Sequence, residues 1–278
     1  MKKLLLTIIS FFSLATALQA QALQVGTYNI RQRNTIDEGN LWQDRREYLC
    51  KLIRYHDFDL LGIQEAFKDQ LEDMLKLLPK YGAVGVGRDD GKDKGEHSAI
   101  LYKKSRFTLI KSDTFWLSDT DTEKPNKGWD AALPRICTWA IFEDKENGKR
   151  FIMMNTHFDH VGKVARTESA KLMLQKAHKL AKDLPLIITG DLNVDEKSDA
   201  YNTLASSPYI QDTYELAPLV YEPNSTFNGW GKSLKAKERI DHIFISKPFN
   251  VLKYGVLTDT YMGKFPSDHF PVLVHMEW

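Results

Sequence analysis

Short apolar runs recur along almost the whole 278-residue chain, and charged or glycine-bearing turns separate them. Runs of this length, rich in β-branched and aromatic residues, are typical of buried strands. We expect strands at residues 23–30, 58–63, 81–86, 97–103, 107–117, 136–142, 151–156, 184–189, 240–246, 251–257 and 271–276. So many strands need two sheets.

Four other segments carry apolar residues at helical spacing, and they come from both halves of the chain. We expect helices at residues 41–55, 68–78, 163–182 and 198–205. Such a chain fits a four-layer α/β/β/α sandwich, in which two mostly antiparallel sheets pack face to face under outer helices. Because we find no linker, repeat or low-complexity segment, we expect one domain over residues 23–278.

The first residues have the pattern of a secretory signal peptide. Lys2 and Lys3 precede a mostly apolar stretch, residues 4–18, and the small residues Ala20 and Ala22 offer cleavage points. The alternative is a membrane anchor, but the apolar stretch is shorter than the ~20 residues that a membrane span needs. We therefore expect a signal peptide over residues 1–22, export to the periplasm or medium, and no stable membrane insertion.

The charge balance says little in favour of a nucleic-acid partner. The chain has 38 Lys and Arg against 37 Asp and Glu, and loss of the leader removes Lys2 and Lys3, which leaves 36 against 37. Proteins that hold many nucleic-acid phosphates usually carry a basic surplus. A nucleic-acid substrate stays open but is not favoured, and a compact substrate fits better.

The two cysteines, Cys50 and Cys137, are isolated in the sequence and lack the spacing of a zinc site. In an oxidising compartment they could pair. Two buried thiols are an equally good interpretation, so both alternatives remain open.

Polar residues gather at the ends of the apolar runs, where a sheet presents functional groups. Any one of them could be a turn residue, but six such sites are hard to assign to turns. They are Asn29 in TYNIR, Glu65 in LLGIQEA, His157 and Asp159 in FIMMNTHFDH, Asp191 and Asn193 in GDLNVD, Asp241 in RIDHIFIS, and Asp268 and His269 in PSDHFPV.

In this order, the motifs resemble those of the endonuclease/exonuclease/phosphatase superfamily, a group of magnesium-dependent phosphoesterases. The resemblance spans Asn29 to His269 and so covers essentially the whole chain after the leader. It implies the sandwich fold and a metal-dependent hydrolysis of phosphoesters. The TH motif looks more like the deadenylase and sphingomyelinase branches than the abasic-site nucleases.

The resemblance also implies a metal site built from Asn29, Glu65 and Asp268. Glu65 matches the principal metal ligand of the family, and Asn29 and Asp268 can supply or orient further ligands. Mg²⁺ prefers such hard oxygen ligands. Mn²⁺ would satisfy the same oxygens.

Five residues match the catalytic groups of the family. Asp191 would hold or deprotonate the attacking water, and Asn193 would bind the phosphoryl group, on the same side as Asp191 if that segment is extended. His157 would donate to a phosphoryl oxygen. Asp241 would orient His269 and favour its doubly protonated form, which would stabilise charge on the phosphorus.

A second set of residues is expected to contact the substrate. Arg31, Arg135 and Arg166 could grip a phosphate bidentately, although solvated arginines are the common alternative. His97 precedes a strand and could point into the cleft, and Asp159 extends the TH motif.

The substrate stays open between classes. We expect an exported phosphatase or phosphodiesterase that acts, as a monomer, on a small or medium phosphorylated substrate. The polar segment 120–133, which carries Trp129, is expected to define the substrate. A secreted nuclease is the alternative. A non-catalytic binding module is disfavoured because the expected metal ligands and the water-activating Asp191 are all present.

Overall fold

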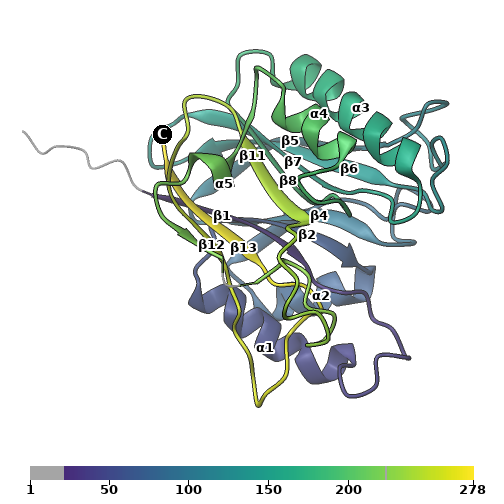
Figure 1. Cartoon of the computed structure of the whole chain (residues 1–278). Coiled ribbons are helices and arrows are strands. Elements are labelled where there is room, and N and C mark those ends of the chain that lie inside the picture. The colour runs from purple at the N-terminus through teal and green to yellow at the C-terminus, as the bar shows by residue number, and fades with distance from the viewer. Residues whose placement is uncertain (1–21, 223) are drawn as a thin grey trace, which may run out of the picture.

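The structure, a computed structural model, is described for residues 22–222 and 224–278 and consists of two packed sheets with helices outside them (Figure 1). The predicted signal peptide, residues 1–22, therefore lies outside the described residues except for Ala22. The four-layer α/β/β/α sandwich is confirmed.

The first sheet has seven strands and carries the N-terminal end of the described chain. Its order is β10 (Val220–Tyr221), β12 (Asn250–Val256), β13 (Val272–Glu277), β1 (Leu23–Asn29), β2 (Leu60–Ala66), β4 (His97–Lys103) and β3 (Tyr81–Val84).

The second sheet has six strands from the middle and the later part of the chain. Its order is β5 (Phe107–Trp116), β6 (Ile136–Asp144), β7 (Arg150–His157), β8 (Leu186–Asp191), β11 (Asp241–Ile245) and β9 (Gln211–Asp212). Most neighbouring strands are antiparallel, as predicted. The parallel pairs are β1–β2 in the first sheet, β7–β8 in the second, and the short β10–β12 pair.

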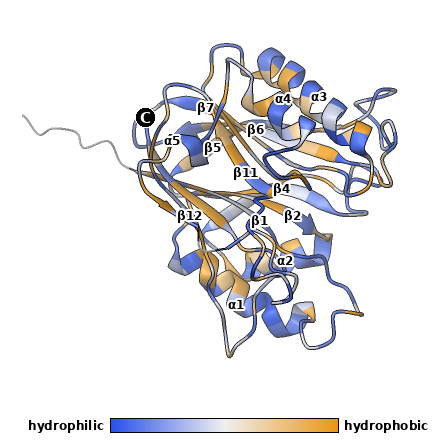
Figure 2. Ribbon diagram, viewed as in Figure 1, coloured by the Kyte–Doolittle hydropathy of each residue, from blue (hydrophilic) through white to orange (hydrophobic). Residues whose placement is uncertain are grey.

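Helices cover the outer face of each sheet. Helices α1 (Trp42–Tyr55) and α2 (Lys68–Leu77) pack on the first sheet, and α3 (Lys163–Ala181) and α4 (Asp199–Ala205) pack on the second. The short α5 (Thr213–Leu216) lies beside β11 and β12. The buried apolar residues form one cluster between the sheets and one under each helical layer, and apolar colour follows the strands and the inner helix faces in Figure 2.

The predicted elements are all present, with shifted ends and three additions. The strands β9 and β10 and the helix α5 were not predicted, because elements of two to four residues are too short to show a periodic pattern. Strands β2 and β8 extend past the predicted ends into Glu65 and Asp191. Asp191 continues the pairing of β8 with β7 and β11. Glu65 instead lies where the pairing of β2 with β4 shifts register between Ile63 and Ala66, so both side chains sit at strand ends but only Asp191 is held by a regular ladder.

A buried polar ladder joins the two sheets under these strand ends. The side-chain amide of Asn155 in β7 donates to the carbonyl oxygens of Ile63 and Ala99 in the first sheet, at 2.9 Å each. The side-chain amide of Gln64 donates in turn to Asn155 Oδ1 at 2.7 Å. A methyl group at Gly62 would overlap Asn155, so the close approach requires glycine there. The ladder fixes the spacing of the sheets, and hence of the side chains above it.

Cys50 in α1 and Cys137 in β6 are both buried free thiols. The disulfide alternative is therefore not realised in this structure. Within residues 22–222 and 224–278, no helix is long and apolar enough to span a membrane.

Candidate active site

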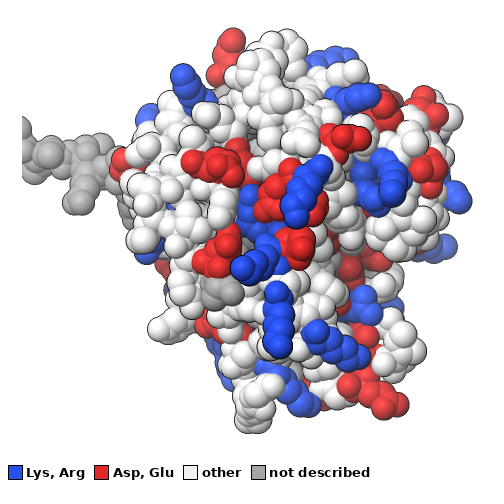
Figure 3. All heavy atoms as spheres, in the orientation of Figure 1, with Lys and Arg blue, Asp and Glu red and all other residues white. Residues whose placement is uncertain are grey.

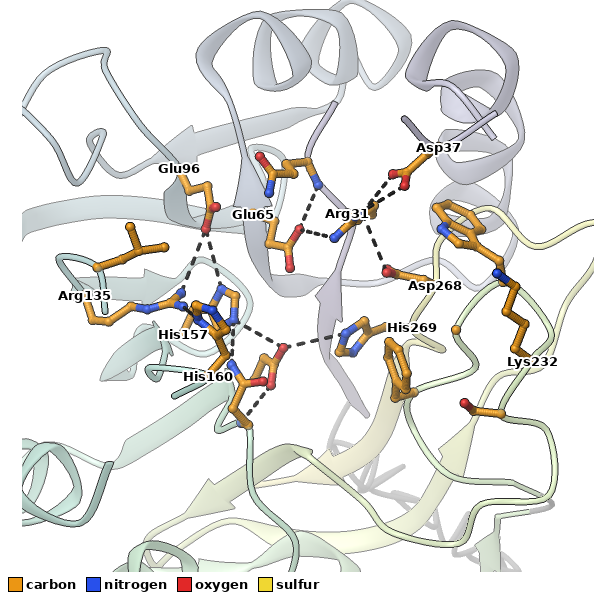
Figure 4. A pocket seen from close by; sticks show the side chains of 18 residues that line it. Arg31, Asp37, Glu65, Glu96, Arg135, His157, His160, Lys232, Asp268 and His269 are labelled. Carbon is orange, nitrogen blue, oxygen red and sulfur yellow. Dashed lines mark hydrogen bonds and ion pairs between the residues drawn. The ribbon is translucent and has the colours of Figure 1, made fainter. Parts of the chain in front are cut away.

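One edge of the sandwich gathers the ends of strands from both sheets around a cavity of about 630 Å³ (Figure 4). Strands β1 and β2 are parallel, as are β7 and β8, so their carboxyl ends meet at this edge. The start of β11 and the segment before β13 complete it. The predicted site residues that line the cavity are Arg31, Glu65, Arg135, His157, Asp191, Asn193, Asp268 and His269.

An acidic cluster around Arg31 forms one part of the cavity. Arg31 makes a bidentate ion pair with Asp37, at 2.9 and 3.1 Å. Its guanidinium also lies 3.8 Å from Glu65 Oε2 and 3.7 Å from Asp268 Oδ2. Figure 4 shows the three carboxylates converging on this guanidinium from the ends of different elements. Arg31 therefore neutralises part of a concentrated negative charge.

Glu65 and Asp268 differ in how readily they ionise. Burial opposes the charge of Glu65, but hydrogen bonds from the Gln32 N–H and the Asn29 amide lower its pKa. Burial and the nearby Glu65 charge raise the pKa of Asp268. Glu65 also has a left-handed backbone, with φ of 65°. Such strain outside glycine costs free energy and recurs at functional sites.

Asp191 lies at the centre of the cavity and touches groups from both sheets. Its Oδ2 accepts from the Asn29 amide at 2.9 Å and lies 3.4 Å from His157 Nε2 and 3.7 Å from His269 Nε2. Burial and the charge of Asp241 raise the pKa of Asp191 to about 7. A carboxylate with this pKa can accept and release a proton near neutral pH.

His269 and Asp241 form a buried pair next to Asp191. The His269 Nδ1 hydrogen-bonds Asp241 Oδ2 at 2.9 Å. Burial opposes protonation, but the charges of Asp241 and Asp191 outweigh it and raise the pKa of His269 to about 10. His269 is therefore a cation at neutral pH. Asp241 does not line the cavity and acts from behind the ring.

Asn193 and His157 form the wall beside Asp191. Asn193 is not in an extended segment, which corrects the conditional expectation from the sequence, because its φ is 51°. Its backbone N–H donates to Asp191 Oδ1, and its side-chain amide lies 3.0 Å from His157 Nε2. Burial and the charge of Arg135 lower the pKa of His157 well below its usual value. The neutral ring accepts at Nε2, so its proton lies on Nδ1, which faces Glu96.

Asn29 is fully buried beneath the cavity and does not line it. Its amide nitrogen donates to both Glu65 and Asp191, and its Oδ1 accepts from the Arg31 N–H. In this arrangement Asn29 orients two carboxylates.

Three predicted substrate contacts lie away from the cavity. The His97 ring is buried and contacts the Ala66 carbonyl oxygen at 3.1 Å. Asp159 accepts backbone N–H groups of two loops, including those of Ala132 and Gly162, and Arg166 donates to the Asp159 carbonyl oxygen. Their contacts hold loops in place.

The segment 120–133, expected to define the substrate, contributes only Leu133 to the cavity lining. The Trp129 backbone N–H donates to the Asp119 carboxylate, and the Trp129 side chain does not line the cavity.

The sequence interpretation missed several lining residues, and most of them come from loops without a periodic pattern. The missed residues with polar or aromatic side chains are Gln32, Asp37, Glu96, His160, Phe227, Lys232 and Ser233. Trp230 also lines the cavity and has a left-handed backbone, with φ of 60°. Glu96 alone carried a usable signal, since it directly precedes strand β4.

The sequence profile of the Endonuclease/Exonuclease/phosphatase family matches residues 26–269. A solved mannosyl-6-phosphatase from Bacteroides thetaiotaomicron is 46% identical, with a TM-score of 0.90 and coverage of 92% of this chain and all of that one. A Bacteroides vulgatus structure named for the same family is 37% identical, with a TM-score of 0.89 and coverage of 92% and 99%.

The chain belongs to the endonuclease/exonuclease/phosphatase family. Members of this family hydrolyse phosphoesters and generally depend on a divalent metal. The more distant Ccr4 exoribonuclease subunit of Mycosarcoma maydis is 23% identical over 300 residues. That match covers 83% of this chain, which spans 44% of the length of that relative.

The donor chemistry of the cavity fits a divalent metal of this family. Glu65 and Asp268 present two hard carboxylates to the same space, and their side chains are 12% and 10% exposed. A second group, Asp191, Asp241 and His269, also offers donor atoms within 4.8 Å of one another. In that group Asp241 is fully buried, does not line the cavity and already binds His269 Nδ1. Glu65 and Asp268 are therefore the better candidates.

Proposed function

We propose that this protein is an exported, metal-dependent phosphomonoesterase that acts on phosphorylated sugars. The observation that carries the proposal is the end-to-end similarity to a mannosyl-6-phosphatase at 46% identity. The cavity supports it, because about 630 Å³ suits a small ligand. Mg²⁺ is the metal that we propose, since the candidate ligands are oxygens.

The side chains divide the work of hydrolysis between them. The cationic His269 holds a phosphoryl oxygen and stabilises the charge that develops on it. The Asn193 side-chain amide donates to His157 Nε2 and to the Phe158 carbonyl oxygen, and so holds the His157 ring beside the phosphoryl site. Asp191 orients the attacking water and takes its proton, for which its pKa near 7 is suited. The metal, when bound by Glu65 and Asp268, supplies positive charge to the phosphoryl oxygens.

The charge distribution supports a small substrate over a long polyanion. Figure 3 shows acidic and basic side chains interspersed over one face of the described residues, without a broad basic patch in that view. A nucleic-acid groove is expected to carry a basic stripe. Because the Ccr4 relative is an exoribonuclease subunit, exoribonuclease activity is the competing function.

A substrate panel separates these functions. The purified chain with Mg²⁺ is offered mannose 6-phosphate, phenyl phosphate, bis(4-nitrophenyl) phosphate and an oligoadenylate RNA. We expect kcat/KM to be highest for mannose 6-phosphate and at least 100-fold lower for the RNA and the diester. A preference for the RNA would replace this proposal with the exoribonuclease function.

A further inference from the structure

Glu96 forms the wall of the cavity opposite the Asp268 side, and the mechanism above does not use it (Figure 4). It directly precedes strand β4 and is only 7% exposed. Burial raises its pKa against the opposing charge of Arg88, and the charge of Glu65 adds to the rise. A buried carboxylate is costly unless the fold pairs it or a ligand uses it.

The contacts of Glu96 all use one oxygen. Its Oε2 accepts from Arg88 at 2.6 Å and lies 3.9 Å from Arg135 Nη1 and 3.8 Å from His157 Nδ1. Within the described part of the chain, the other carboxylate oxygen, Glu96 Oε1, does not make the contacts with Arg88, Arg135 or His157. The carboxylate therefore keeps an acceptor available at the cavity wall.

Arg135 offers a donor beside this acceptor. Its side chain is 5% exposed, and its other nitrogens bind Asp159 and His160. Its Nη1 is buried and has no hydrogen-bond partner in the described part of the chain. An unpaired buried donor that lines a cavity is a candidate ligand contact.

The positive and negative side chains of this wall balance each other, and this balance determines which ligand groups the wall can bind. The two guanidinium groups of Arg88 and Arg135 face the carboxylates of Glu96 and Asp159. A second phosphate here would meet the Glu96 carboxylate and would be repelled. A hydroxyl group fits instead, because it can donate to Glu96 and accept from Arg135.

We propose that Glu96 and Arg135 form a subsite that binds hydroxyl groups on the sugar part of the substrate. The inference rests on the proposed function, since it places the phosphate at His269 and Asp191 and the sugar beside it. Phe227 and Trp230 line the same cavity and can cover the apolar face of a sugar ring.

Ligand binding to a catalytically inactive variant tests the subsite. The Asp191→Asn variant with Mg²⁺ is titrated calorimetrically with mannose 6-phosphate and with methyl phosphate, which lacks the sugar. We expect mannose 6-phosphate to bind at least tenfold more tightly, as hydrogen bonds to charged groups predict. Adding Glu96→Gln should reduce this preference to less than threefold and leave the methyl phosphate affinity unchanged.

Asp89→Asn is the matched control. Asp89 lies on the same loop, is about half exposed, and approaches Arg88 at 3.8 Å without lining the cavity. This variant should retain the full preference for mannose 6-phosphate. Equal loss of both affinities in Glu96→Gln would overturn the subsite, because Glu96 would then act through His157.

The subsite and the proposed function can fail separately. No tenfold preference in the Asp191→Asn parent, including failure to bind either compound, overturns the subsite. If the preference is present but the unmodified chain does not hydrolyse mannose 6-phosphate, the subsite stands and the proposed function fails.

Discussion

At the scale of single residues, the site depends on ionisable side chains whose burial costs folding free energy. Asp191 is buried beside Asp241 and His269, and burial and the charge of Asp241 raise its pKa to about 7. The fold therefore stabilises the ionised form less than the unfolded chain does. Active sites commonly accept such a cost in stability for the sake of the chemistry.

Replacing Asp191 should separate activity from stability. We expect Asp191→Asn to lower kcat by about 10²- to 10⁴-fold, the usual contribution of a general base. Its free energy of unfolding at pH 8, measured in chelator, should equal or exceed that of the unmodified chain, because no ionised carboxylate remains to be buried. A variant that keeps its activity would contradict the role of Asp191.

The residues that could be predicted from the sequence share one property: they follow or open apolar strands in short motifs. Asn29, Glu65, Asp191 and His269 were found in this way, and the structure brings all four together. Glu96 was missed although it directly precedes a strand, because the sequence does not show its contacts with Arg88, Arg135 and His157. His97 was expected to point into the cleft, but it does not line the cavity, whereas its neighbour Glu96 does. Successive side chains along a strand point to opposite sides, and sequence alone did not show which of the two faces the cavity.

At the scale of elements, buried arginines hold the loops that carry the site. Arg45 in α1 donates to the carbonyl oxygens of Ile30 and Pro266, at 2.6 and 3.0 Å. It thereby joins the loop of Arg31 to the segment that leads to Asp268. From sequence, Arg45 reads as an ordinary polar residue of a helix, because its carbonyl partners are up to 221 residues away.

Arg239 performs a similar task beside Asp241. It is 2% exposed, pairs with Glu196 at 2.6 Å and donates to Asp212 at 3.2 Å. These contacts connect the segment before β11 to strand β9. Strand β9 was not predicted, because two residues give no pattern and its position follows from this pairing.

The Asp212 carboxylate should make stability depend on pH. Burial opposes its charge, but His242 and Arg239 prevail and lower its pKa to about 2. A depressed folded pKa stabilises the fold above the unfolded value near 3.8, and this contribution is lost as the pH falls through 2. We expect Asp212→Asn to lower the free energy of unfolding by about 2 kcal/mol at pH 6.

Acid titration of the same variant checks the sign. The difference in unfolding free energy between Asp212→Asn and the unmodified chain should shrink between pH 4 and pH 2. Chemical denaturation at several pH values measures it. A difference that is constant down to pH 2 would mean that Asp212 stabilises β9 by packing rather than by charge.

At the scale of the whole molecule, the sandwich brings strand ends from both sheets to one edge. The alternation of apolar and polar runs fits this architecture, because each sheet must bury one face against the other and one under helices. The strand count alone did not establish it, and the resemblance to the family supported the same fold. Sequence could not predict the cavity walls from residues 227–233, which come from a loop shaped by long-range contacts such as that of Asn228 with Ser267.

Export remains our proposal for the whole chain and predicts a processed N-terminus. When the full-length sequence is produced in a bacterial host, the periplasmic or secreted protein should begin near residue 23, as determined by intact mass and N-terminal sequencing. Recovery of the uncleaved chain in the cytoplasm would contradict the signal peptide.

The proposed function requires that water attacks the phosphorus of a phosphomonoester in this cavity. This is tested by hydrolysis of methyl α-mannoside 6-phosphate, whose anomeric oxygen cannot exchange with water, in H₂¹⁸O with Mg²⁺, followed by mass spectrometry of both products. We predict that the released phosphate carries one ¹⁸O, that the methyl mannoside carries none, and that chelator stops the release. Label in the methyl mannoside would mean that water attacks carbon rather than phosphorus, and no phosphate release with Mg²⁺ would contradict the proposed phosphomonoesterase.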